Sequence, residues 1–191
     1  MILRTYIPNI LSVLRLLTVP LLIFFSYKGY PTIFLALLTF SFITDALDGA
    51  IARKFNLQSS LGAKLDSVAD FAVYLAIPVC AWLLWPEVIW QEKFYVAAVV
   101  CSIVLPVLIG LLKFGSYTSY HTWLTKIAAV FMAISSIVLF LGGTVWLFHI
   151  AVVVCVLASL EEILITFLLT EAKSDVGSLW RVIKRHYRKH V

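Results

Sequence analysis

Charged residues and cysteines are both scarce in this chain. Only 13% of its 191 residues are Asp, Glu, Lys or Arg, whereas a soluble domain carries about 25%. This excludes an ordinary water-soluble enzyme and a disordered tail protein. The 3 cysteines lie singly inside apolar runs, without a CxxC pair and without a histidine at ligand spacing. A disulfide-stapled secreted scaffold is therefore excluded as well, and buried reduced thiols are the favoured interpretation of the cysteines.

Apolar residues dominate instead, at 62% of the chain. A membrane-spanning helix needs about 20 consecutive apolar residues. Six such runs are present, at about 9–27, 32–53, 60–85, 94–112, 123–141 and 144–169. We therefore expect an all-α integral membrane protein with six transmembrane helices, forming a single domain over residues 1–191. Residues from about 32 to 85 are expected to form a helical hairpin.

The basic residues predict how these spans are oriented. With six spans, thirteen of the 15 Lys and Arg lie on the side that holds both termini, and only Lys28 and Lys93 lie on the other. Positive charge collects on the cytoplasmic side of membrane proteins. We expect both termini to be cytoplasmic, in a bacterial inner membrane.

The last 21 residues, 171–191, have a pattern of their own. Between 176 and 189, apolar residues recur at helical spacing among five Lys and Arg, and the stripe consists of Val176, Leu179, Trp180, Ile183 and Tyr187. This predicts a basic amphipathic helix on the membrane surface, with a solvated charged tail as the alternative. The net charge of +5 then indicates anionic lipid headgroups as the partner and not nucleic acid.

Four acidic residues fall within or beside the second and third runs. They are Asp45, Asp48, Asp66 and Asp70. An ionisable residue inside a span costs several kcal/mol and indicates function. On two antiparallel helices joined by a short polar loop, the two acidic stripes are expected to face each other near the cytoplasmic end. The alternative is a purely structural role, in which the acids pair with Arg53, Lys54 and Lys64.

Facing carboxylates suit hard divalent cations, Mg²⁺ or Mn²⁺, and the lack of His and Cys argues against zinc. Two such ions can clamp the attacking and leaving oxygens of a phosphoryl transfer. Gly49, Ala52 and Gly62 let a phosphate-bearing ligand approach the backbone, and Arg53 offers a planar cation for phosphate.

This segment resembles the signature of the CDP-alcohol phosphatidyltransferase family. The residues that carry the resemblance are Asp45, Asp48, Gly49, Ala52, Arg53, Gly62, Asp66 and Asp70. The resemblance implies a six-helix membrane fold, usually homodimeric, with its active site open to the cytoplasm. It also implies attack by an acceptor hydroxyl on CDP-diacylglycerol, with release of CMP.

The resemblance further implies a role for each position. Asp45, Asp48 and Asp66 would bind two divalent cations, and Asp70 would be a ligand, the general base, or both. The CDP site would be formed by Asp48, Gly49, Ala52, Arg53, Gly62 and Asp66.

The acceptor alcohol is indicated by conflicting features. Residues 8–15, PNILSVLR, resemble phosphatidylglycerophosphate synthases, which favours glycerol 3-phosphate. Ser67 and Phe71 depart from that pattern, and Ser67 looks more like phosphatidylserine synthases and some relatives that use an inositol phosphate. Serine, inositol or an inositol phosphate is therefore the alternative acceptor. The residues expected to bind the acceptor are Arg15, Lys64, Lys113, His121 and Lys126. Arg15 has a structural alternative, in which it reaches lipid phosphates or pairs with the acidic cluster.

Two further acids, Glu161 and Glu162, lie within the last span. Pairing with Lys126 is the favoured interpretation, and a role in acceptor binding is the alternative. Two other classes of protein also use intramembrane carboxylates. A UbiA-type prenyltransferase needs more spans than this chain offers, and a cation transporter usually shows paired repeats, which are absent here.

Overall fold

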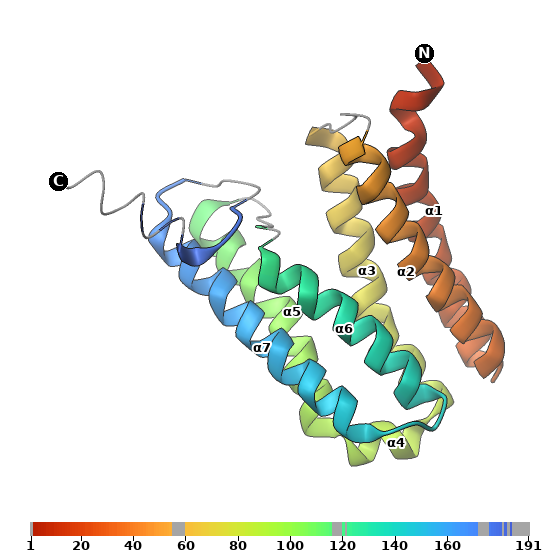
Figure 1. Cartoon of the computed structure of the whole chain (residues 1–191). Helices are drawn as coiled ribbons and strands as arrows, with labels where there is room; N and C mark the ends of the chain where they lie inside the picture. The colour runs from red at the N-terminus through yellow and green to blue at the C-terminus, as the bar shows by residue number, and fades with distance from the viewer. Residues whose placement is uncertain are drawn as a thin grey trace. The chain divides into compact units, whose positions relative to one another are not determined.

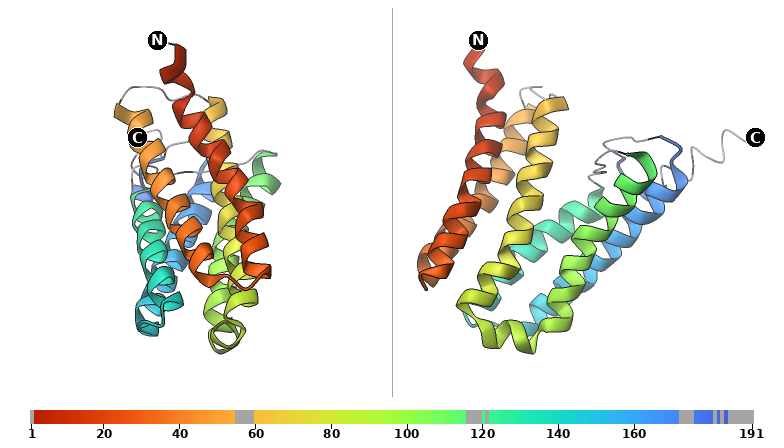
Figure 2. Two further views of the ribbon diagram at one scale, coloured as in Figure 1. Left: turned by 90° about the vertical axis from the view of Figure 1, so that its right-hand side faces the viewer. Right: turned by 180° about the vertical axis from the view of Figure 1, so that it is seen from behind.

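The computed structural model describes residues 2–54, 60–115, 120, 122–171, 176–180, 182 and 184, and within these ranges all regular structure is helical. The chain divides into two compact units, Met1–Gln91 and Glu92–Val191. Each unit is a group of long helices (Figures 1 and 2). A single domain over residues 1–191 stays a prediction.

The first unit contains α1 (Ile2–Tyr27), α2 (Pro31–Lys54), α3 (Ser60–Leu84) and the short α4 (Pro86–Gln91). In it, α1 packs along both α2 and α3 (Figure 1). The buried face of α1 repeats every three or four residues, as a helix requires, and consists of Ser12, Arg15, Thr18, Leu22 and Ser26. Most of this face is polar, and the hydroxyls of Thr18 and Ser26 donate to carbonyls of α1 itself.

The turn between α1 and α2 depends on a glycine. Gly29 has a φ of 73°, in the left-handed region that glycine adopts without strain. Its N–H donates to the carbonyl of Ser26 at 3.0 Å, and the N–H of Tyr30 donates to that of Phe25 at 3.0 Å. These bonds satisfy carbonyls at the end of α1 and reverse the chain into α2.

The second unit contains α5 (Lys93–Phe114), α6 (Trp123–Phe140) and α7 (Val145–Leu168). Here α7 packs against both α5 and α6. At the start of α5, Glu92 Oε2 lies 2.7 Å from His149 Nε2, and the ring of Tyr95 stacks on His149 with centroids 3.8 Å apart. These contacts fix the beginning of α7 beside the beginning of α5.

The predicted helices agree closely with the structure, with two differences. Where the sequence predicts a first helix after Pro8, α1 begins at Ile2. Where it predicts a stop at Pro86, the short α4 follows. Proline suits the first position of a helix because its missing N–H would have no partner there, and Glu87 in the first turn favours the same start.

Five of the described helices are long and apolar enough to cross a membrane. They are found at Ile10–Tyr27, Leu65–Leu84, Lys93–Phe114, Trp123–Phe140 and Val145–Leu168. Within the described side chains of α2, the apolar segment is shorter, Pro31–Leu47, although the helix itself has 24 residues. Six spans are therefore not confirmed and stay a prediction.

The predicted interfacial helix at the C-terminus is not confirmed either. Much of it, including Ile183 and Tyr187, lies outside the described residues. Val182 is buried in a cluster with Tyr120 and Ile165, and Leu169, Val176 and Leu179 pack against this cluster. Val176 and Leu179 of the predicted apolar stripe thus contact apolar groups at the end of α7, and the membrane-surface helix stays a prediction. Trp180 has 73% of its surface exposed.

Candidate active site

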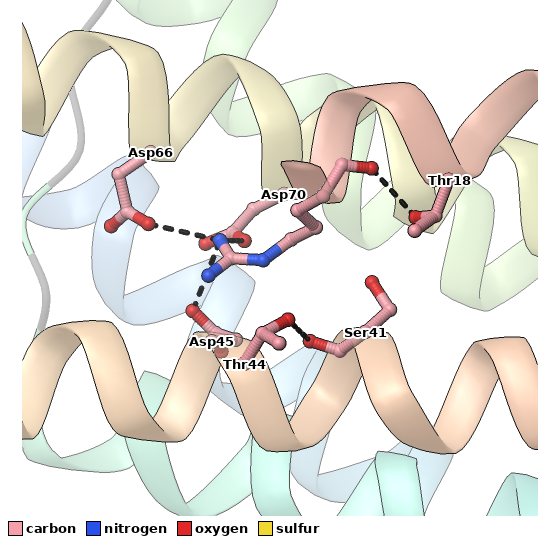
Figure 3. A network of polar contacts seen from close by, with 7 residues as sticks. Thr18, Ser41, Thr44, Asp45, Asp66 and Asp70 are labelled. Atoms are coloured by element: carbon pink, nitrogen blue, oxygen red, sulfur yellow. Dashed lines mark hydrogen bonds and ion pairs between the residues drawn. The ribbon is translucent and has the colours of Figure 1, made fainter. Parts of the chain in front are cut away.

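Three carboxylates from two helices converge in the first unit. Asp45 comes from α2, and Asp66 and Asp70 come from adjacent turns of α3. One oxygen from each lies within 4.8 Å of the others, and Figure 3 shows the three side chains pointing toward one another. Their side chains are 37%, 29% and 21% exposed, respectively. The predicted convergence of the acids on α2 and α3 is thus present for these three.

The centre of this cluster is the side chain of Arg15, which comes from α1. Its Nη1 lies 3.2 Å from Asp45 Oδ1, 2.9 Å from Asp66 Oδ1 and 2.5 Å from Asp70 Oδ1. Only 2% of the Arg15 side chain is exposed. A single guanidinium nitrogen therefore contacts one oxygen of each acid, and α1 contributes the cation of a site whose anions belong to α2 and α3.

Local hydrogen bonds hold the helices that carry these groups. The hydroxyl of Thr18 donates to the Arg15 carbonyl at 2.6 Å, and that of Thr44 donates to the Ser41 carbonyl at 2.8 Å. Both hydroxyls are satisfied within their own helices, so they can be buried beside the charged cluster at little cost (Figure 3).

The donor set suits a hard divalent cation. The three acids offer oxygen atoms only, which Mg²⁺ and Mn²⁺ prefer. The three oxygens around Arg15 Nη1 already converge on one positively charged group. The residues present therefore fit a metal held by Asp45, Asp66 and Asp70. Whether Asp48 completes a two-metal site stays a prediction, because its side chain lies outside the described part of α2.

The rest of the predicted CDP site is described only in part. Gly62 lies in the first turn of α3, one turn before Asp66. The backbone of the other positions is helical, but the side chains of Asp48, Gly49, Ala52 and Arg53 lie outside the described residues. The same holds for Lys64, which was expected to bind the acceptor. His121 lies outside them altogether.

The structure gives local partners to two residues that were expected to bind the acceptor. Lys113 Nζ donates to the carbonyls of Thr166 and Phe167, each at 3.0 Å, and so stabilises the end of α7. Lys126 is exposed, with its Nζ 5.5 Å from the centre of the Trp123 ring. Both lie in the second unit, and Arg15 lies in the first.

Glu161 has partners that the sequence did not predict. Its Oε2 accepts a hydrogen bond from the Thr122 hydroxyl at 2.8 Å, and its Oε1 accepts one from the N–H of Leu179 at 3.0 Å. The expected pairing with Lys126 is therefore replaced by neutral donors. Thr122 caps the start of α6, where its hydroxyl also accepts from the N–H of Thr125. A threonine before an apolar run was the available signal for this cap.

Comparison with known proteins identifies relatives. The model of the family described as CDP-alcohol phosphatidyltransferase matches residues 5–173. A cardiolipin synthase (CMP-forming) of Streptomyces coelicolor is 32% identical over 160 residues, which cover 77% of this chain and 71% of the relative.

Two relatives match over shorter segments. A CDP-diacylglycerol–inositol 3-phosphatidyltransferase of Saccharomyces cerevisiae is 51% identical over 65 residues, covering 34% of this chain and 29% of the relative. The protein of that name from Candida albicans is 36% identical over 88 residues, covering 45% of this chain and 38% of the relative. This chain thus matches less than half the length of these two proteins. No solved structure matches the chain. Because the family model extends over most of its length, the chain belongs to the CDP-alcohol phosphatidyltransferase family.

Proposed function

We propose that the protein transfers a phosphatidyl group from CDP-diacylglycerol to the hydroxyl of an alcohol and releases CMP. The observation that carries this proposal is the convergence of Asp45, Asp66 and Asp70, at the spacing of the family signature, into a group of oxygens that suits a divalent metal. Phosphoryl transfer depends on positioning and charge neutralisation more than on covalent chemistry of the protein, so an acidic metal site is the main requirement.

Each residue of the site then has a defined task. Asp45, Asp48, Asp66 and Asp70 hold two divalent cations, Mg²⁺ or Mn²⁺. The bound metal supplies positive charge to the diphosphate of the donor lipid. The small residues Gly49, Ala52 and Gly62 leave room for the CDP group, which Asp48, Arg53 and Asp66 help to position.

In the proposed reaction one bond at phosphorus replaces another, and Asp70 receives the proton of the acceptor hydroxyl. The acceptor oxygen forms a bond to the phosphorus that carries the diacylglycerol, while the bond from that phosphorus to the CMP oxygen breaks. Asp70 accepts the proton of the attacking hydroxyl, which requires a carboxylate within hydrogen-bond reach of the acceptor. The partial exposure of Asp70, 21%, is consistent with access by a small alcohol.

For the acceptor we propose glycerol 3-phosphate. The buried Arg15 beside the carboxylates is a cation that can pair with the acceptor's phosphate. Lys64, Lys113, His121 and Lys126 remain further proposed contacts, although Lys113 has hydrogen-bond partners of its own. Inositol is the second candidate, because two relatives are named as inositol 3-phosphatidyltransferases.

One experiment tests the reaction and the acceptor together. Protein purified in detergent is incubated with CDP-diacylglycerol, Mg²⁺ or Mn²⁺, and one acceptor at a time, and CMP release is measured. The panel contains glycerol 3-phosphate, inositol, serine and phosphatidylglycerol. Release that depends on one acceptor supports the reaction and identifies the substrate, whereas no release with any of them contradicts the proposed class.

We also propose that the protein is a homodimer, with both termini and the active site on the cytoplasmic side. Protease accessibility of a C-terminal tag in sealed inner-membrane vesicles of known orientation tests the topology. Cross-linking in the membrane, followed by mass measurement, tests the dimer.

A further inference from the structure

A single nitrogen of Arg15 contacts the three carboxylate oxygens that a metal ion at this site would bind. Its Nη1 is within 3.2 Å of Oδ1 of all three acids. A magnesium ion bound to carboxylate oxygens lies about 2.0–2.1 Å from each of them. An ion held by the same three oxygens would therefore lie in the space beside Nη1, where the two positive charges repel each other strongly.

From this geometry we propose that Arg15 and the divalent cation are alternative occupants of the three Oδ1 atoms. Binding of the metal displaces the guanidinium from Asp45, Asp66 and Asp70, and the displaced Arg15 then pairs with a phosphate of the substrates. This inference rests on the proposed function for the identity of the phosphate, but not for the competition itself.

The burial of Arg15 explains why such an exchange would be linked to substrate binding. A buried guanidinium is costly unless it is paired, and only 2% of this side chain is exposed. Once the carboxylates coordinate metal, Arg15 needs another anion close by. The diphosphate of a CDP-lipid, or the phosphate of the acceptor, meets that need. The exchange would therefore favour phosphate binding only after the metal is in place.

The displacement can be measured without substrates. Detergent-solubilised protein is treated with phenylglyoxal, which modifies accessible arginines, either with EDTA or with Mn²⁺, and peptide mass spectrometry follows Arg15, with Arg188 of the tail as an internal reference. We expect Arg15 to react slowly with EDTA and at least several-fold faster with Mn²⁺. An unchanged or slower reaction with Mn²⁺ would show that arginine and metal share the cluster through different oxygens, and would overturn the proposal.

The affinity for the metal provides a second readout. Binding of Mn²⁺ is followed by electron paramagnetic resonance in wild type, Arg15→Met and Arg15→Lys. Removing the competing cation in Arg15→Met should tighten Mn²⁺ binding at least about tenfold, since charges only a few ångströms apart interact strongly. Arg15→Lys, which keeps a positive charge, should stay close to wild type. Weaker or unchanged binding in Arg15→Met contradicts the competition.

Lys28→Met is the matched control. It also removes one positive charge, but Lys28 lies in the turn after α1, where its Nζ is 5.9 Å from the centre of the Phe24 ring. The Mn²⁺ affinity of Lys28→Met should equal that of wild type. If Mn²⁺ binding tightened equally in Lys28→Met and Arg15→Met, the cause would be the change in net charge alone, and the proposal would be overturned. These assays contain neither CDP-diacylglycerol nor an acceptor, so their outcome is independent of CMP release. They can contradict the competition while CMP release supports the proposed function, and they can support the competition while CMP release is absent.

Discussion

Arg15 Nη1 donates a hydrogen bond to Asp66 Oδ1 at 2.9 Å, and the two residues are 51 positions apart in the chain. The contact joins α1 to α3, and the contact of the same nitrogen with Asp45 joins α1 to α2. The first helix therefore completes the charged centre of the first unit. Removal of any one member changes both the charge of the site and the attachment of a helix.

Asp66→Asn should abolish CMP release and leave the fold intact. The substitution removes a metal ligand, so we expect a loss of at least about 100-fold, which is about 2.7 kcal/mol of transition-state stabilisation. Arg15 retains Asp45 and Asp70 as partners, and removal of one charge also lessens repulsion among the acids. The measurements are CMP release and the unfolding temperature in detergent, which should move by only a few degrees.

The metal requirement provides the control for this variant. Excess EDTA should lower CMP release by wild type to the same extent as the substitution does. Added Mg²⁺ or Mn²⁺ should restore CMP release by wild type but not by Asp66→Asn. Full activity of Asp66→Asn, or of wild type in EDTA, would rule out the metal site.

Arg15→Ala should raise the KM of the acceptor far more than the KM of CDP-diacylglycerol. Loss of a charge-assisted hydrogen bond costs about 1.5–3 kcal/mol, or roughly 10- to 150-fold. Arg15→Lys, which keeps the charge without the planar fork, should have an intermediate effect. Steady-state kinetics with each substrate varied in turn measure both constants. Equal changes in the two would assign Arg15 a structural role only.

Lys113→Met should lower stability, whether or not it also changes the KM of the acceptor. Lys113 donates to two carbonyls at the end of α7, and because its side chain is exposed we expect a loss of only about 0.5–1 kcal/mol. The unfolding temperature, followed by tryptophan fluorescence, measures the first effect. A rise in the acceptor KM would support the proposed acceptor contact of Lys113, and unchanged stability would contradict its structural role.

Glu161→Leu should destabilise the second unit by about 1–3 kcal/mol, because it removes the acceptor for the Thr122 hydroxyl and the Leu179 N–H. Limited proteolysis should then cleave the chain after α7 more rapidly. Lys126→Met is the control, and its unfolding temperature should match wild type because Lys126 is exposed. Should the two variants lose the same stability, Glu161 and Lys126 would be partners after all.

The sequence predicted the helices and the acidic cluster well, for a physical reason. Long apolar runs can only be helical in a membrane, and the four-residue spacing of Asp66 and Asp70 places them on one face of α3 whatever surrounds it. These features depend on local pattern, so no tertiary information was needed.

The partners of buried charges could not be predicted in the same way. For Arg15 the sequence left three partners open, which were the acceptor, lipid phosphates and the acidic cluster. Only the packing of α1 along α2 and α3 shows that Arg15 contacts the acidic cluster. For Glu161 the nearest basic residue by depth was Lys126. The chain instead folds back after α7 and brings the N–H of Leu179 to the carboxylate. Such contacts depend on how distant segments pack.

Glycerol 3-phosphate should support CMP release, and glycerol should support little. The acceptor's phosphate adds about two negative charges beside a diphosphate, so the site must supply cations for it, and Arg15 is the described cation at the carboxylate cluster. We expect the phosphate to contribute at least about 3 kcal/mol to kcat/KM, a preference of about 150-fold over glycerol. Comparable turnover of inositol would mean that the relatives named for inositol transfer are the better guide. Arg15 would then serve the donor's diphosphate, and Arg15→Ala should raise the KM of CDP-diacylglycerol instead.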